Sequence, residues 1–117
     1  MPVITADSVG AQLARLGQEL DQLVEVLGAQ ELKAIHTKAA AQRKEAKAYL
    51  AAEGPVEERK REAYLYASEA LEEAEVEEAV VRHIKAQIRA VEARIDIGRT
   101  LGATVRAELA TLGSVPS

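Results

Sequence analysis

The stretch AAEGPVEE, residues 51–58, contains the strongest helix break in the interior of the chain. Gly54 and Pro55 end a helix and form a turn. Pro55 also fits the first turn of a new helix. Glu57 and Glu58 would stabilise that turn, because their negative charges lie near the positive end of the helix dipole. We therefore expect one long helical arm on each side of this turn, folded back as an antiparallel helical hairpin.

The composition on both sides of the turn is typical of a long-helix protein. Of the 117 residues, 48% are apolar and only 3% aromatic, and the sequence has no Cys, Trp or Phe. Gly28 is a weaker break in the first arm, and the sequence leaves open whether it breaks or only bends that arm. We predict an all-α fold and one helical domain, residues 1–117, with helices at about 7–27, 30–52 and 56–112.

Apolar residues recur in alternating steps of three and four, as in a coiled coil. In residues 7–27 this seam is Leu13, Leu16, Leu20, Leu23 and Leu27. In residues 30–52 the same rhythm selects Leu32, Ile35, Ala39, Gln42, Ala46 and Tyr49. After the turn it selects Ala63, Ala67, Ala70, Ala74, Val81, Ile84, Ile88, Val91, Ile95, Val105, Leu109 and Leu112. Glu77 interrupts this last series, and Gly98 and Gly102 occupy places where large apolar residues would continue it.

Centring the hairpin on Gly54 gives two checks on the pairing of the arms. It places Leu13 opposite Ile95, large against large, and pairs small residues with each other near the turn. It also places the mainly acidic charges of residues 7–27 opposite the mainly basic charges of residues 82–99. Lys33 and Lys38 come to lie opposite the acidic block 69–78. Reciprocal charge blocks favour this antiparallel pairing and penalise slippage.

Further apolar residues widen the stripe beyond what two helices can bury. These residues are Val24, Val26, Leu71, Val80, Ile97 and Leu101. A second copy of the chain would cover them, so we predict a homodimer that forms a helical bundle. The residues expected at the oligomer or partner interface are Leu13, Leu16, Leu20, Leu23, Ile84, Ile88, Val91, Ile95, Val105, Leu109 and Leu112.

Candidate catalytic and metal-binding patterns are weak. Neither His36 nor His83 has a glutamate three residues before it, so the Glu-x-x-His pair of helical metal sites is missing. Gly98 and Gly102 lack the lysine of a phosphate loop. The carboxylates of residues 69–78 are better explained as a solvated face opposite lysines than as a cation site. We predict a non-enzymatic protein without cofactor or metal.

A basic and aromatic cluster near the turn supports an alternative function, the binding of single-stranded nucleic acid. Its members are Arg43, Lys44, Lys47, Tyr49, Arg59, Lys60, Arg61 and Tyr64. The net charge of −4 works against this, as do the glutamates around the turn. The competing interpretation is that the tyrosines flank an alanine-rich core while the basic groups solvate the hairpin.

The stretch IRAVEARIDIGRTL, residues 88–101, with RAEL at 106–109, resembles small helical proteins encoded by bacteriophages of actinobacteria. The resemblance implies an accessory or host-takeover role and brings no catalytic or binding residues with it. The leading hypothesis is a helical interaction and assembly module that binds an unidentified protein partner. The alternative is a single-stranded nucleic-acid-binding accessory protein of replication or recombination. Since the sequence has no long apolar run and no signal-peptide pattern, we expect no membrane association and a cytoplasmic location, the host cytoplasm if the chain is phage-encoded.

Overall fold

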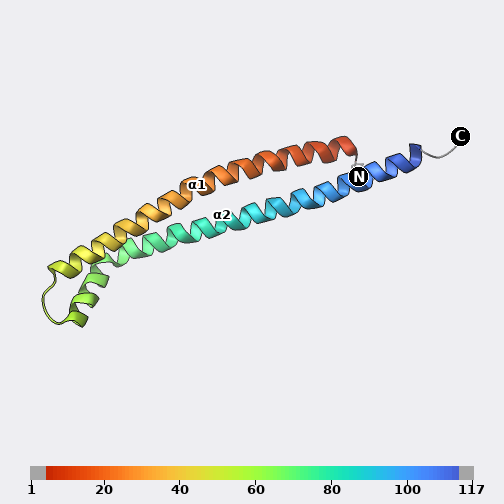
Figure 1. The fold of residues 1–117 in the computed structure, drawn as a ribbon. Helices are drawn as coiled ribbons and strands as arrows, with labels where there is room; N and C mark the ends of the chain where they lie inside the picture. Colours follow the sequence, from red (N-terminus) through yellow and green to blue (C-terminus); the bar gives the residue numbers. More distant parts are fainter. Residues whose placement is uncertain (1–4, 114–117) are drawn as a thin grey trace. The chain divides into compact units, whose positions relative to one another are not determined.

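The computed structural model describes residues 5–113 and shows two α-helices joined by a short turn (Figure 1). Helix α1 spans Ala6–Ala51 and helix α2 spans Val56–Gly113. Within the described residues there is no strand. The predicted all-α helical hairpin is therefore confirmed, and the turn lies at Gly54, whose φ of 107° favours glycine over any other residue.

Polar groups satisfy the ends of α1. At its start, the Ser8 amide donates to the Thr5 hydroxyl (3.1 Å) and the Thr5 amide donates to the Ser8 hydroxyl (3.0 Å), in the manner of a capping box. The last turn of α1 has no basic residue of its own. Arg59 of α2 fills this role, because its guanidinium donates to the Tyr49 carbonyl (3.1 Å) and places a positive charge at the negative end of the helix dipole.

Helix α1 continues through Gly28, so the predicted separation into helices 7–27 and 30–52 is wrong. A single glycine costs a helix about 1 kcal/mol relative to alanine. That cost is too small to end α1, because the turns on both sides of Gly28 consist of good helix formers and pack against α2.

Because α1 does not break, its buried seam keeps its phase, and the seam predicted for residues 30–52 is wrong. The buried residues there are Ala34 and Ala41, with Gln30 half-buried. Leu32 and Ile35, which the sequence placed in the seam, are 57% and 63% exposed. The predicted series Leu32, Ile35, Ala39, Gln42, Ala46 and Tyr49 has heptad spacing, but it follows a flank of α1 beside the seam.

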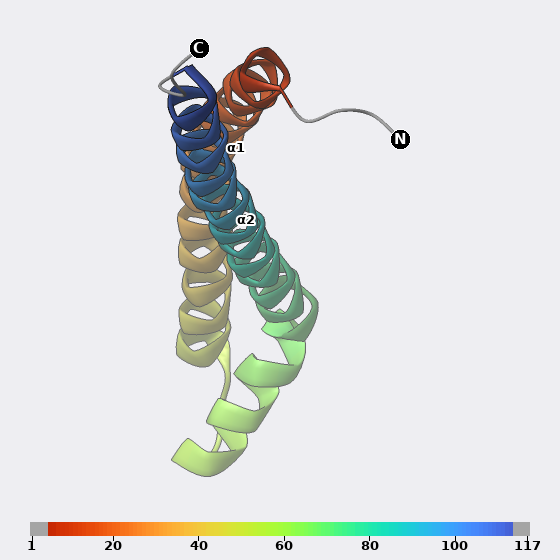
Figure 2. The same cartoon turned by 90° about the vertical axis from the view of Figure 1, so that its right-hand side faces the viewer.

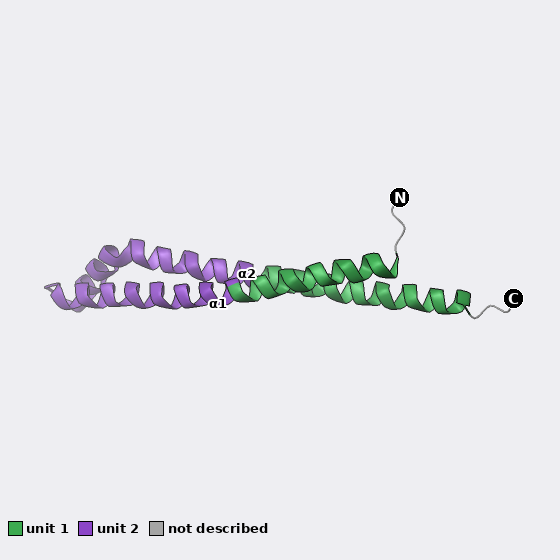
Figure 3. Ribbon diagram, turned by 90° about the horizontal axis from the view of Figure 1, so that it is seen from above, with its two compact units in different colours: residues 1–25, 86–117 green, residues 26–85 purple. Residues whose placement is uncertain are grey.

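The chain divides into two compact units, drawn in different colours in Figure 3. Unit 1 comprises, of the described chain, residues 5–25 and 86–113, and unit 2 comprises Val26–Lys85. In each unit a stretch of α1 runs antiparallel to a stretch of α2. That the two units behave as a single domain stays a prediction.

Unit 1 is packed with large aliphatic side chains. Val9, Leu16 and Val91 are buried, and the half-buried seam leucines and isoleucines surround them. A Cβ atom added to Gly98 would lie 2.8 Å from Cδ2 of Leu13. Leu13 thus packs on Gly98, three residues beyond the predicted Ile95, because the missing glycine side chain makes room for it.

Unit 2 is packed with alanine. Its buried residues are Ala34, Ala41, Ala63, Ala67, Ala74 and Ile84. Ala41 and Ala67 are 0% exposed, which shows how closely the two helices approach each other there. The first turns of α2, light green in Figure 2, run at an angle to the rest of that helix.

Candidate interaction surface

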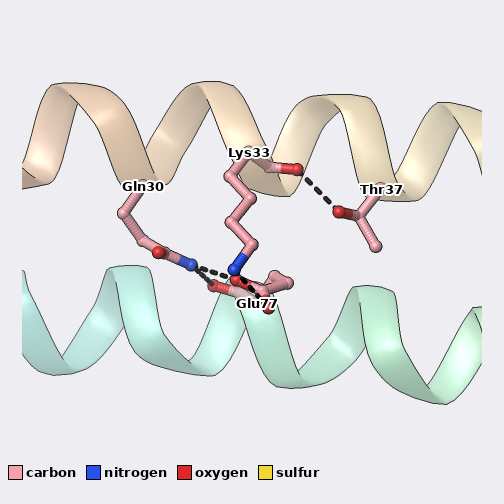
Figure 4. A network of polar contacts seen from close by, with 4 residues as sticks. All are labelled: Gln30, Lys33, Thr37 and Glu77. Atoms are coloured by element: carbon pink, nitrogen blue, oxygen red, sulfur yellow. Dashed lines mark hydrogen bonds and ion pairs between the residues drawn. The ribbon is translucent and has the colours of Figure 1, made fainter.

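A polar network crosses the alanine seam of unit 2 (Figure 4). The Gln30 side-chain amide donates to the Glu77 carbonyl oxygen (3.2 Å) and to the Glu77 carboxylate, and Lys33 Nζ lies 3.4 Å from Glu77 Oε1. The hydrogen bond from Gln30 lowers the pKa of Glu77; partial burial opposes this change, and Lys33 adds to the lowering through its charge and a hydrogen bond. Glu77, the predicted interruption of the seam, therefore has a partner in the facing helix.

The sequence predicted part of this network. It placed Lys33 and Lys38 opposite the acidic block that contains Glu77 and Glu78. In the structure Lys33 forms an ion pair with Glu77, and Lys38 forms one with Glu78, each at 3.4 Å. Gln30 was missed, because the expected break at Gly28 removed it from the seam. The signal that could have identified Gln30 is its spacing from Leu23 and Leu27 in an unbroken heptad.

Most of the residues predicted for the oligomer or partner interface are used inside the hairpin. Leu16, Ile84 and Val91 are buried, and Leu13, Leu20, Leu23, Ile88, Ile95 and Val105 are half-buried. Only the last two residues of that set remain open, Leu109 at 56% and Leu112 at 71% exposed. The buried and half-buried residues of the set pack within the hairpin, and a role of the set toward a partner stays a prediction.

Unit 2 instead exposes other large apolar side chains along one groove between its helices. Three hollows of 690, 730 and 360 Å³ share lining residues from one to the next: Gln42, Glu45 and Tyr64 line the first two, and Lys38 and Glu78 line the last two. We call these three hollows together the long groove. Ile35, Leu50 and Tyr64 line it with 63%, 76% and 58% of their surface exposed.

The residues of the predicted nucleic-acid cluster do not all line one surface. Tyr49, Lys60 and Tyr64 lie together in the long groove. Lys47 lines a separate hollow of 380 Å³ with Tyr66. Arg43 and Arg61 are exposed and line neither of these hollows.

Two of the tyrosine rings near the turn already have cations over them. The Arg59 guanidinium lies 4.4 Å from the centre of the Tyr49 ring, and Lys44 Nζ lies 5.0 Å from the centre of the Tyr66 ring. Each pair contributes a modest cation–π attraction, about 0.5–1 kcal/mol at exposed sites. Arg59 and Tyr49 therefore join the two helices beside the turn. Tyr64 has no such cation over its ring within the described chain.

The described residues form no group of three or more His, Asp or Glu side chains arranged to hold a metal ion. His36 and His83 are both exposed. In the same part of the chain, neither helix contains a stretch long and apolar enough to cross a membrane. Comparison with protein-family models, with curated proteins and with solved structures finds no match for this chain.

Proposed function

We propose that this protein is a non-enzymatic helical interaction module whose unit 2 is covered by another helical surface. The observation that carries the proposal is the inverted distribution of side-chain size in unit 2. Alanines fill its seam, while Ile35, Leu50 and Tyr64 are 58–76% exposed along the long groove. Exposed apolar side chains gathered along one unit are a mark of protein–protein contact surfaces.

The resemblance of residues 88–101 and 106–109 to actinobacterial phage proteins supports a more specific form of this proposal. In that form the module is an accessory or host-takeover protein that acts in the cytoplasm of the host cell. Its partner is a protein, and it requires no cofactor.

Site-specific photo-crosslinking in the producing cell tests the proposal. A photoreactive residue at Leu50, which is 76% exposed, should give discrete protein adducts. The same residue at Glu19, an exposed polar position of unit 1, serves as the control. Adducts that are equally sparse at both positions would contradict an interaction module.

The alternative function, binding of single-stranded nucleic acid, is favoured by one observation: Tyr49, Lys60 and Tyr64 line the same groove. Stacking on an aromatic ring is worth about 1–3 kcal/mol per base. Fluorescence anisotropy with a labelled oligonucleotide at two salt concentrations tests it. Tight, salt-sensitive binding that is lost in the variant Lys44→Glu, Lys60→Glu would favour this alternative over the interaction module.

A further inference from the structure

The charged residues of the long groove follow an ordered pattern along both helices. The inference rests on the proposed function, in which another helical surface covers unit 2. The charge pattern indicates what that surface is. In order from the turn, the charged groove residues of α1 are Glu45, Lys38 and Glu31. In the same order, those of α2 are Lys60, then Glu72, Glu75 and Glu78, then Arg82. The signs run negative, positive, negative along α1 and positive, negative, positive along α2.

Within one chain, only the middle of this pattern is paired across the groove. Lys38 Nζ lies 3.4 Å from Glu78 Oε1. Among residues 5–113, no ion pair within 4.0 Å forms at Glu31, Glu45 or Arg82, and Lys60 pairs with Glu57 of its own helix at 3.7 Å. Both ends of the groove therefore present charges that can pair with an occupant.

We infer that the long groove is covered by the long groove of a second copy, related by a two-fold axis parallel to the helices. This axis places α1 of one copy over α2 of the other, with the two turns at the same end. Opposite charges then face each other at both ends and in the middle, and the exposed apolar side chains Ile35, Leu50 and Tyr64 become buried between them. The product is a four-helix bundle built from two copies of unit 2.

The other two-fold arrangement, with its axis perpendicular to the helices, is disfavoured by the same charges. It places α1 over α1, so that Glu31 faces Glu45 and Lys38 faces its own copy. It also places α2 over α2, so that Lys60 faces Arg82 and the acidic block faces itself. Since like charges facing each other across an interface cost free energy, the order of charges selects one of the two symmetric dimers.

The size of the groove sets the expected strength of the dimer. Residues 31–49 of α1 span about 27 Å, and two packed helices are about 20 Å wide. The projected contact is then about 540 Å² per copy, or about 1,100 Å² in total, which is at the lower end of specific interfaces. We therefore expect a dimer that dissociates in the micromolar range.

Sedimentation equilibrium from about 1 to about 200 µM tests the inference. The unaltered chain should shift from monomer to dimer across this range. Ile35→Asp should raise the dissociation constant about 100-fold, because two-fold symmetry introduces the buried charge twice. Leu65→Asp is the matched control: Leu65 is 64% exposed, against 63% for Ile35, but it does not line the groove.

Each outcome of this experiment decides the inference. A chain that stays monomeric at every concentration overturns it, and so does a dimer that both variants weaken equally. A monomer that still gives adducts with other proteins in the photo-crosslinking experiment leaves the interaction module standing, so the two proposals can fail separately. Both substituted positions are exposed, so the helices of each variant should stay folded. Circular dichroism of each variant checks this.

A spin label tests the direction of the axis. The chain has no cysteine, so Glu53→Cys near the turn gives a single labelling site. The parallel axis places the two labels less than about 30 Å apart, whereas the perpendicular axis separates them by about 40 Å, because 13 residues of α1 follow Lys38 in each copy. A longer distance in the dimer overturns the proposed geometry, and a shorter one supports it.

Discussion

Units 1 and 2 use the same two helices but pack them with different residues. Unit 1 fills its seam with Leu16 and Val91 and accommodates large side chains by placing glycine opposite them. Unit 2 fills its seam with alanine and places a polar network at Gln30 and Glu77. Large aliphatic side chains are thus buried in the seam of the first unit, whereas the seam of the second buries small ones and leaves Ile35, Leu50 and Tyr64 exposed along the long groove.

The largest difference should appear when a large seam residue of unit 1 is shortened. Leu16 is 8% exposed, so Leu16→Ala should lower the free energy of unfolding by about 2–5 kcal/mol through lost burial and a cavity. Urea denaturation measures this change. Val24→Ala, at a residue 54% exposed in the same unit, is the control, and an equal loss in both variants would contradict the assignment of Leu16 to the core.

The complementary change enlarges a residue of the alanine seam. Ala41 is 0% exposed, so Ala41→Leu should force the helices of unit 2 apart and cost about 1–3 kcal/mol. Ala40→Leu adds the same atoms at an exposed position and should leave stability almost unchanged. Thermal unfolding of both variants measures the difference, and a neutral Ala41→Leu would mean that the seam of unit 2 is loosely packed.

The fold was predictable from the sequence wherever one strong signal decided it. Gly54 and Pro55 identified the turn, and the leucines of residues 13–23 identified the seam of unit 1. The seam of residues 30–52 was not predictable in the same way, because two heptad series overlap there. The series with Leu32 and Ile35 is more apolar, yet the series with Ala34 and Ala41 is buried, since the phase set by Leu23 and Leu27 continues through Gly28.

The candidate surface could also be predicted only in part. Tyr49, Lys60 and Tyr64 were expected near one another, and they do line one groove. The distribution of Lys47 and Tyr66 into a separate hollow depends on the rotation of each helix about its own axis, which spacing alone does not determine to the required accuracy. A shift of one residue turns a helix by about 100°, enough to move a side chain from one flank to another.

The glycines offer a smaller test of the same comparison. A Cβ atom at Gly28 would meet nothing within 4 Å, so Gly28→Ala should raise the free energy of unfolding by about 1 kcal/mol through helix propensity. In Gly98→Ala the added methyl would meet Leu13 at 2.8 Å, so displacement of that leucine should offset the gain. Urea denaturation of the two variants separates these effects, and equal stabilisation would show that Leu13 moves aside without cost.

The polar network of unit 2 should give the smallest effect, visible as a dependence of stability on pH. The pKa of Glu77 lies below its ordinary value of 4.5 in the folded chain, chiefly because of the hydrogen bond from Gln30. The unfolded chain therefore binds the proton first as the pH falls. The contribution of Glu77 is complete above the unfolded pKa and is lost as the pH falls from there through the lower folded pKa.

Urea denaturation between pH 7 and pH 3 measures this contribution, and Glu77→Gln should remove it, because glutamine can still accept the hydrogen bond from Gln30 but does not titrate. Glu69→Gln removes an exposed carboxylate of the same helix and should leave the dependence unchanged. The distinction depends on location, because Gln30 and Lys33 of the facing helix hold the Glu77 carboxylate in the seam, whereas Glu69 is exposed. Identical pH profiles for the two variants would mean that the network orders the side chains of Gln30 and Glu77 without contributing to the stability of unit 2.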